Sequence, residues 1–146
     1  MILAVDLGVK TGMALFNSSG EPQWVRSRNF GNLARLKRAI PHLLHELPSS
    51  SIIVIEGGGI IAKAWEEEAK KQHFNIIKIH AATWRNDLLY QRQQRKGTEA
   101  KKNALRLALQ ILRKSGIPAP KSLTDDAAEA FLIGYWFIHH YIISDK

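Results

Sequence analysis

The sequence contains no cysteine among its 146 residues. Disulfides and thiolate metal sites are therefore excluded, and we expect a reducing, cytoplasmic compartment of bacterial type. The amino terminus carries Asp6 and no basic residue before it, which is not the pattern of a signal peptide. The longest near-apolar run, 127–143, contains Glu129, His139 and His140 and is shorter than a membrane span requires. We therefore expect a buried helix there and no membrane association.

The sequence has fewer acidic than basic residues. The chain has 13 Asp and Glu against 21 Lys and Arg, which gives a net charge of +8. Such an excess of positive charge favours a polyanionic partner, nucleic acid above all. The length and the 45% hydrophobic content predict one domain over residues 1–146.

Hydrophobic periodicity and turn residues predict the element order βββαβαβαα. Short connections favour an antiparallel meander for the first three strands, and later strands separated by helices favour parallel pairing. We expect an α/β fold with a mixed five-stranded sheet flanked by helices. Pro41 should kink or split the first helix, and a loop is expected near Thr83 and Trp84. The expected strands are 1–8, 11–17, 23–30, 49–59 and 75–81, and the expected helices are 32–47, 60–74, 98–116 and 122–144.

Two of the apolar strands end in an acid. Asp6 closes "ILAVD" and Glu56 closes "IIVIE". If these strands are parallel neighbours, their carboxylates emerge side by side at the carboxyl edge of the sheet, where α/β proteins bind ligands. Each acid has a structural alternative as a turn-forming residue, and the combination is more specific than either alone.

The last helix begins with three more acids, Asp125, Asp126 and Glu129. At about 100° per residue, Glu129 lies within about 60° of the other two. Asp125 and Asp126, which follow Thr124, are also what a helix amino terminus prefers. Carboxylates that converge on one point require cations, and an all-oxygen donor set favours Mg²⁺ or Mn²⁺. Two such ions can hold a phosphodiester, activate a water and stabilise the leaving oxygen.

Three stretches, "AVDLGVKTGMALF", "IIVIEGGG" and "DDAAEAFLIGYW", resemble the acidic motifs of RuvC-type Holliday-junction resolvases in the ribonuclease-H-like superfamily. The resemblance covers nearly the whole chain. It implies that Asp6, Glu56, Asp126 and Glu129 are catalytic metal ligands, and it leaves Asp125 as a helix-start acid. Glu129 stands where the family often has Asp.

The resemblance implies a ribonuclease-H-like fold and a structure-specific endodeoxyribonuclease that cuts four-way DNA junctions. It also implies two Mg²⁺ ions, replaceable by Mn²⁺, and a homodimer that makes paired cuts. Two alternatives remain: an RNA-processing nuclease similar to the YqgF-type proteins, and a junction-binding module without catalysis. The turn 6–12 also resembles that of actin-like ATPases and sugar kinases, but those need two such domains, so no nucleotide cofactor is expected.

Basic residues cluster between 85 and 102, with six Lys and Arg and two acids. The resemblance places Arg85 near the scissile phosphate, which it would help to position, and Lys101, or second Lys102, beside the active site. It implies that Lys101 is catalytic and stabilises charge on the phosphate. Trp84 and Tyr90 interleave the cluster, as in surfaces that bind nucleic acid, although a solvated helix face is the alternative. The residues expected to bind nucleic acid are Arg85, Arg92, Arg95, Lys96, Lys101 and Lys102.

The chain departs from the resolvase pattern after Glu56. Where the family often has an aromatic residue that can stack on an opened junction base, this sequence has three glycines, 57–59. Trp65 could replace that aromatic residue, or it could belong to the core. His80, which ends the last expected strand, is a further candidate for the active edge.

Overall fold

The computed structural model describes residues 1–90, 97–118 and 122–143. It contains a five-stranded sheet in the order β3-β2-β1-β4-β5. β2 pairs antiparallel with β1 and β3, whereas β4 pairs parallel with β1 and β5. The expected mixed sheet is therefore confirmed. The strands are β1 (Ile2–Asp6), β2 (Lys10–Phe16), β3 (Pro22–Asn29), β4 (Ile52–Glu56) and β5 (Asn75–Ile79).

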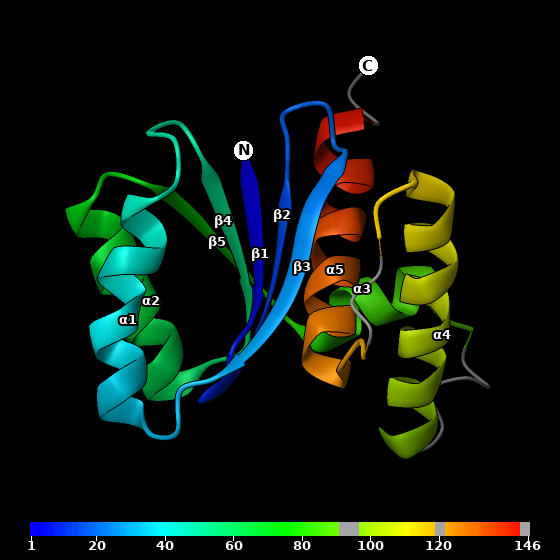
Figure 1. The fold of residues 1–146 in the computed structure, drawn as a ribbon, viewed down its shortest axis with the longest axis horizontal. Coiled ribbons are helices and arrows are strands. Elements are labelled where there is room, and N and C mark those ends of the chain that lie inside the picture. The colour runs from blue at the N-terminus through cyan, green and yellow to red at the C-terminus, as the bar shows by residue number, and fades with distance from the viewer. Residues whose placement is uncertain (91–96, 119–121, 144–146) are drawn as a thin grey trace.

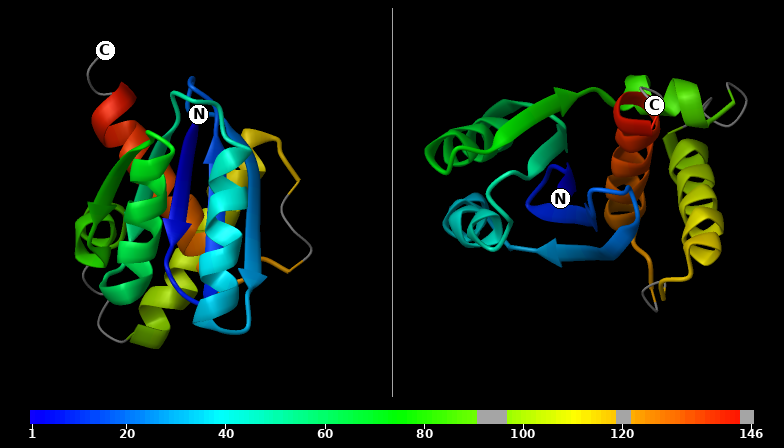
Figure 2. Two further views of the ribbon diagram at one scale, coloured as in Figure 1. Left: turned by 90° about the vertical axis from the view of Figure 1, so that its left-hand side faces the viewer. Right: turned by 90° about the horizontal axis from the view of Figure 1, so that it is seen from above.

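Helices cover both faces of the sheet (Figure 1). α1 and α2 pack together on one face, and α5 packs on the other, with α4 outside it (Figure 2). None of the helices in the described ranges is long and apolar enough to cross a membrane. The helices are α1 (Leu33–His45), α2 (Gly59–Lys71), α3 (Ala81–Leu88), α4 (Gly97–Ser115) and α5 (Asp125–Phe137), which continues as the π-helical turn η2 (Ile138–Ile143).

Alternation along β1 creates two hydrophobic cores. Ile2 and Ala4 point to the α5 side, while Leu3 and Val5 point to the α1 and α2 side. Asp6 continues the Ile2 and Ala4 series, since side chains two apart in a strand share a face. The strand therefore aims this carboxylate at α5.

Three local expectations differ from the structure. Pro41 lies inside α1, which is not split, and its carbonyl accepts a hydrogen bond from Gln72 Nε2, just after α2, at 3.0 Å. The segment around Trp84, expected as a loop, forms α3. Its fully buried indole supplies the tertiary packing that stabilises so short a helix. The last helix, expected over 122–144, begins at Asp125 and becomes π-helical at Ile138.

Candidate metal and active site

Two strands deliver the first pair of acids. β1 and β4 are parallel and in register, with Asp6 paired to Glu56 at their carboxyl ends. The backbone N–H of Leu7 donates to the Glu56 carbonyl at 3.1 Å, which continues the pairing one residue further. The prediction that these two carboxylates lie side by side is confirmed.

α5 supplies the third acid. Glu129 lies one turn into this helix, and its carboxylate meets those of Asp6 and Glu56. One oxygen from each of the three lies within 4.8 Å of the others. Glu56 is 8% exposed and Glu129 is 7% exposed, so the group is largely shielded from water. The three residues are here called the acidic triad.

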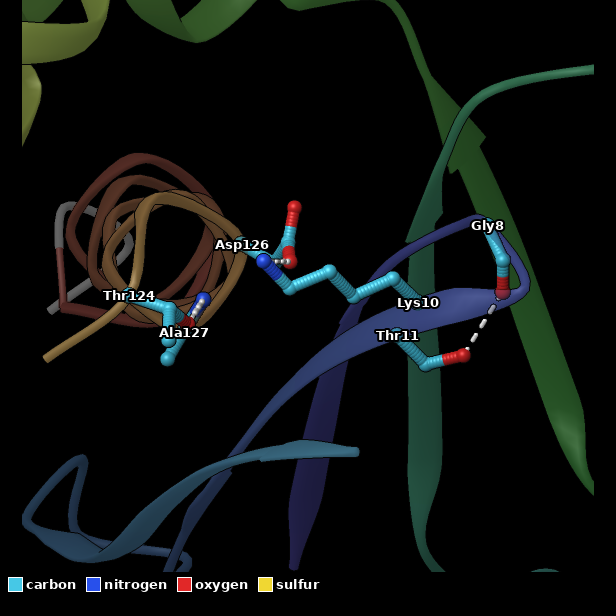
Figure 3. Close-up of polar contacts among 6 residues, drawn as sticks. All are labelled: Gly8, Lys10, Thr11, Thr124, Asp126 and Ala127. Carbon is cyan, nitrogen blue, oxygen red and sulfur yellow. Dashed lines mark hydrogen bonds and ion pairs between the residues drawn. The ribbon is translucent and has the colours of Figure 1, made fainter. Parts of the chain in front are cut away.

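Close packing holds the start of α5 against the sheet. A Cβ at Gly12 in β2 would overlap the Asp126 carbonyl, so only glycine allows this approach. The Thr124 hydroxyl accepts a hydrogen bond from Ala127 N at 3.3 Å and caps the helix (Figure 3). Asp125 is exposed in the first turn, which agrees with its expected place at the helix start.

Asp126, expected as the fourth ligand, is not part of the acidic triad. Its Oδ2 lies 3.6 Å from Lys10 Nζ, at the beginning of β2 (Figure 3). The Lys10 turn is itself held by the Thr11 hydroxyl, which donates to the Gly8 carbonyl at 2.7 Å. The sequence contains this lysine within "DLGVKTG", but its position opposite Asp126 depends on how α5 packs on β2.

The triad carries negative charge in a poorly solvated place. Burial, the charges of Glu129 and Glu56, a hydrogen bond with Glu129 and the charge of Asp126 together raise the pKa of Asp6 to about 9. Burial also raises the pKa of Glu56, although its hydrogen bond from Trp84 acts in the opposite direction. A divalent cation would relieve both effects, because it offsets the repulsion among these carboxylates.

The raised pKa of Asp6 predicts how stability depends on pH. The folded protein keeps the Asp6 proton up to about pH 9, whereas the unfolded chain loses it near its ordinary value of 3.8. The free energy of unfolding contributed by this group therefore falls as pH rises through that window, by at most about 1.4 kcal/mol per pH unit.

Asp6→Asn removes this titration. In EDTA, we expect the variant to be more stable than the wild type at pH 8, with a difference that shrinks as the pH is lowered towards 5. Urea unfolding of both proteins across this range measures the difference. A difference that does not depend on pH would show that Asp6 carries no such penalty.

α3 supplies two partners of the triad. Arg85 Nη2 donates to Glu129 Oε1 at 2.6 Å, and Trp84 Nε1 donates to Glu56 Oε2 at 3.2 Å. The Arg85 guanidinium also lies 5.2 Å from the centre of the Trp84 ring. Arg85, expected near the scissile phosphate, thus stands directly against the acids. Its pairing with Glu129 was not anticipated from the sequence.

Arg85→Gln is expected to destabilise the protein in EDTA by about 1–3 kcal/mol, because Glu129 loses its charged partner in a shielded place. Millimolar Mg²⁺ should recover most of this loss, since a cation at the triad replaces the missing charge. Thermal unfolding with EDTA and with Mg²⁺ measures both effects. Arg106→Gln, which changes an exposed arginine of α4, is the matched control. Equal destabilisation by the two variants would contradict this role of Arg85.

The remaining candidates are spread around this edge. Lys101 and Lys102 are exposed in the first turns of α4, at the same end of the molecule as the start of α5 (Figure 1). His80 is exposed and directly follows Ile79, the β5 partner of Glu56, but it lies outside the triad. The three other basic candidates lie outside the described residues: Arg92, Arg95 and Lys96.

Trp65 is a core residue. It is fully buried with the α1 and α2 side of the sheet, so its indole presents no face to a DNA base. The glycines after Glu56 serve the backbone, because Gly57 (φ 130°) and Gly59 (φ 69°) have positive φ angles that other residues rarely adopt. Glycine at these positions allows β4 to turn directly into α2.

The donor set fits a hard divalent cation. Three carboxylates offer oxygen atoms within 4.8 Å of one another, with no sulfur or imidazole in the group. Mg²⁺ and Mn²⁺ prefer such ligands. Burial first, and the charges of neighbouring carboxylates second, raise the pKa of Asp6 and of Glu56, and a cation bound between them would stabilise their charged forms. Asp6, Glu56 and Glu129 can therefore hold a metal ion.

This sheet order, with α5 carrying an acid to the ends of β1 and β4, is the fold of RuvC-type resolvases, which are ribonuclease-H-like. The structure of T. thermophilus RuvC in complex with a Holliday junction substrate superimposes with a TM-score of 0.62 and 12% sequence identity, covering 96% of this chain and 95% of that one. The Fowlpox virus resolvase in complex with Holliday junction DNA gives a TM-score of 0.70 and 14% identity, covering 97% and 98% of the two chains. No protein-family model and no curated protein sequence matches the chain.

Proposed function

We propose that this chain is a single-domain, divalent-metal-dependent endonuclease that cuts four-way DNA junctions. The observation that carries the proposal is the acidic triad, three shielded carboxylates with oxygens within 4.8 Å, at the carboxyl ends of β1 and β4. Two solved structures that share the fold are those of resolvases in complex with Holliday junctions. The net charge of +8 supports a nucleic-acid substrate.

In this proposal Asp6, Glu56 and Glu129 hold Mg²⁺ or Mn²⁺, and Asp126 joins them as a fourth ligand of a two-ion site. The ions, when bound, neutralise phosphate charge and activate water for hydrolysis of the phosphodiester. Lys10 keeps Asp126 oriented toward the edge of the sheet from 3.6 Å. Trp84 orients Glu56 through its indole N–H.

Basic side chains around the triad would bind and position the phosphate. Arg85 already faces the triad, and it can share its guanidinium between Glu129 and a phosphate oxygen because it has five donors. Lys101, with Lys102 beside it, is proposed to approach the same phosphate from the exposed start of α4. Paired cuts across one junction require two such sites, so the proposal includes a homodimer, which light scattering with and without junction DNA can measure.

Cleavage of a panel of substrates tests the proposal. A four-way DNA junction, a linear duplex, an RNA–DNA hybrid and a structured RNA are incubated with Mg²⁺, with Mn²⁺ and with EDTA. We expect metal-dependent cleavage of the junction alone. Preferential cleavage of RNA would favour the RNA-processing alternative, and binding without cleavage under either metal would favour the non-catalytic module.

A further inference from the structure

A second basic surface lies on the opposite face of the sheet from α5. The segment Pro22–His45, which contains β3 and α1, has five Lys and Arg and no Asp or Glu. Four of the five are arginines, the side chain that best matches phosphate geometry. The basic cluster at 85–102 and the acidic triad do not include any of these residues.

The strand and the helix present these arginines on one face. Val25 points into the core beneath α5, so Arg26 and Arg28 point to the α1 side of β3. Arg35, Arg38 and His42 fall within an arc of about 60° on α1. These five residues, Arg26, Arg28, Arg35, Arg38 and His42, are here called the arginine face.

Four members of the face line a single hollow. Arg28, Arg35, Arg38 and His42 surround a volume of about 440 Å³ together with Asn29, Phe30 and Ala39. Among the residues that the structure describes, no acidic side chain belongs to this lining. Glu46, an acid on the same side of the sheet, lines the neighbouring hollow with Arg26 and Arg28. The hollow between β3 and α1 thus has basic side chains and no acid in its lining, and it should attract anions.

Aromatic rings hold two of the arginines in place. The Arg26 guanidinium lies 4.2 Å from the centre of the Trp24 ring, and that of Arg28 lies 5.1 Å from the Phe30 ring. A guanidinium stacked in this way keeps the N–H groups at its edge available for an anion. The two side chains are thus oriented before any ligand arrives.

The turn between β3 and α1 orients a third arginine. Asn29 Oδ1 accepts from Gly31 N at 2.9 Å, and Asn32 Oδ1 accepts from Arg35 N at 2.9 Å. Gly31 has a φ of 86°, and a Cβ there would lie 3.5 Å from the Arg35 guanidinium. Arg35 therefore lies back over the turn, toward the end of β3 that carries Arg28.

The positive charge of the arginine face is not balanced by ion pairs with acidic side chains of the described residues. Among the described residues, none of the ion pairs involves Arg26, Arg28, Arg35 or Arg38. Like charges three or four residues apart on a helix destabilise it by a few tenths of a kcal/mol. A surface that accepts this cost, with its guanidinium groups preoriented, is suited to an external polyanion.

We propose that the arginine face binds the phosphate backbone of a DNA arm that leaves the active site. The DNA identity of the partner rests on the proposed function. Asn29 at the end of β3 pairs with Lys10, so the face begins beside the end of the sheet that carries the triad. A chain of this length forms a domain about 40 Å across, and a DNA arm of about 20 base pairs is about 70 Å long, so the arm is long enough to extend from the triad along the arginine face.

Binding as a function of salt tests the proposal without any need for cleavage. The affinity of the full chain is measured in EDTA for a junction with arms of about 20 base pairs, and for a 20-base-pair duplex. The triple variant Arg28→Gln, Arg35→Gln, Arg38→Gln is compared with the matched variant Lys70→Gln, Arg113→Gln, Lys114→Gln. The matched variant also removes three positive charges, but from exposed positions of α2 and α4.

We expect the arginine-face variant to bind the junction about 10- to 100-fold more weakly near 0.1 M salt, with a salt slope reduced by about 0.9 for each phosphate that the variant no longer neutralises. The matched variant should change the affinity less than about 3-fold. If the triple variant unfolds, the single variants Arg35→Gln and Arg38→Gln replace it. Each of them should then weaken junction binding by a part of the effect expected for the triple variant.

Equal weakening by both variants would overturn the proposal, because only the net charge would then matter. An unchanged affinity of the arginine-face variant would also overturn it, as would a wild-type protein that binds neither DNA. A protein that cleaves none of the panel substrates, yet loses duplex affinity through the arginine face alone, refutes the proposed function and leaves this surface supported.

Discussion

Asp6→Asn is expected to abolish cleavage of a four-way junction while leaving junction binding intact. The substitution removes one carboxylate from the acidic triad and keeps the size of the side chain. A metal site that loses a charged ligand in a shielded place loses several kcal/mol of transition-state stabilisation, and about 4 kcal/mol corresponds to a rate about 10³-fold lower. Single-turnover cleavage in Mg²⁺ and binding in EDTA measure the two effects separately.

Asp125→Asn is the matched control, because Asp125 is an exposed acid in the same helix turn as Asp126 and stands outside the triad. It should cleave within a few fold of the wild type. Asp6→Asn should also unfold at higher temperature than the wild type in EDTA, because burial and the neighbouring carboxylates raise the pKa of Asp6 and penalise its charged form. Loss of folding and binding in Asp6→Asn would instead assign this residue a structural role.

Gly12→Ala is expected to cause the largest loss of stability of any methyl-sized change near the site, about 2–4 kcal/mol. The new Cβ would overlap the Asp126 carbonyl and crowd Ala127 N. These are backbone atoms at the start of a helix that is buried along its length, so they cannot move aside as a flexible side chain can. The start of α5 must shift away from β2, and Glu129 shifts with it.

Cleavage should therefore fall together with stability in Gly12→Ala, and urea unfolding and junction cleavage measure the two losses. Gly58→Ala is the control, because a Cβ at Gly58 would meet no atom within 4 Å and its φ of −147° suits any residue. Because Gly58 is the N-cap of α2, that variant should lose less than about 1 kcal/mol of stability, and it should cleave like the wild type. A Gly12→Ala protein that unfolds at the wild-type midpoint would show that α5 does not depend on this close approach.

The strands and the first two acids could be predicted because their signals are local. Apolar runs that end in Asp6 and Glu56 indicate both the strands and the residues at their carboxyl ends. The helix between the later strands indicates parallel pairing, and parallel neighbours bring their carboxyl ends to one edge. The position of Glu129 at that edge was predicted from its place in the last helix together with the family resemblance.

The surroundings of these acids could not be predicted in the same way. α3 is a short helix whose signal is weaker than the packing of its buried Trp84, so a loop was expected there. The Arg85–Glu129 pair joins residues 44 apart, and the Lys10–Asp126 pair joins β2 to α5. Local periodicity contains no information about such distances.

The arginine face shows the same division. Its composition is plain in the sequence, since Pro22–His45 has five Lys and Arg and no Asp or Glu. Only the packed structure shows that β3 and α1 turn four of its members toward one hollow. Side-chain direction in each element is local, but the angle and distance between elements depend on how their apolar faces pack.

The sequence by itself thus determined the order of the strands and of every helix except α3, the mixed sheet, and the two acids at the ends of β1 and β4, because strand period and chain connectivity specify them. Tertiary structure decided which charges meet. It joined Glu129 to Asp6 and Glu56, turned Asp126 toward Lys10, and placed Arg85 against the triad. The physical reason is that the close fit of α5 on Gly12 sets these distances, and that fit depends on atoms more than a hundred residues apart in the chain.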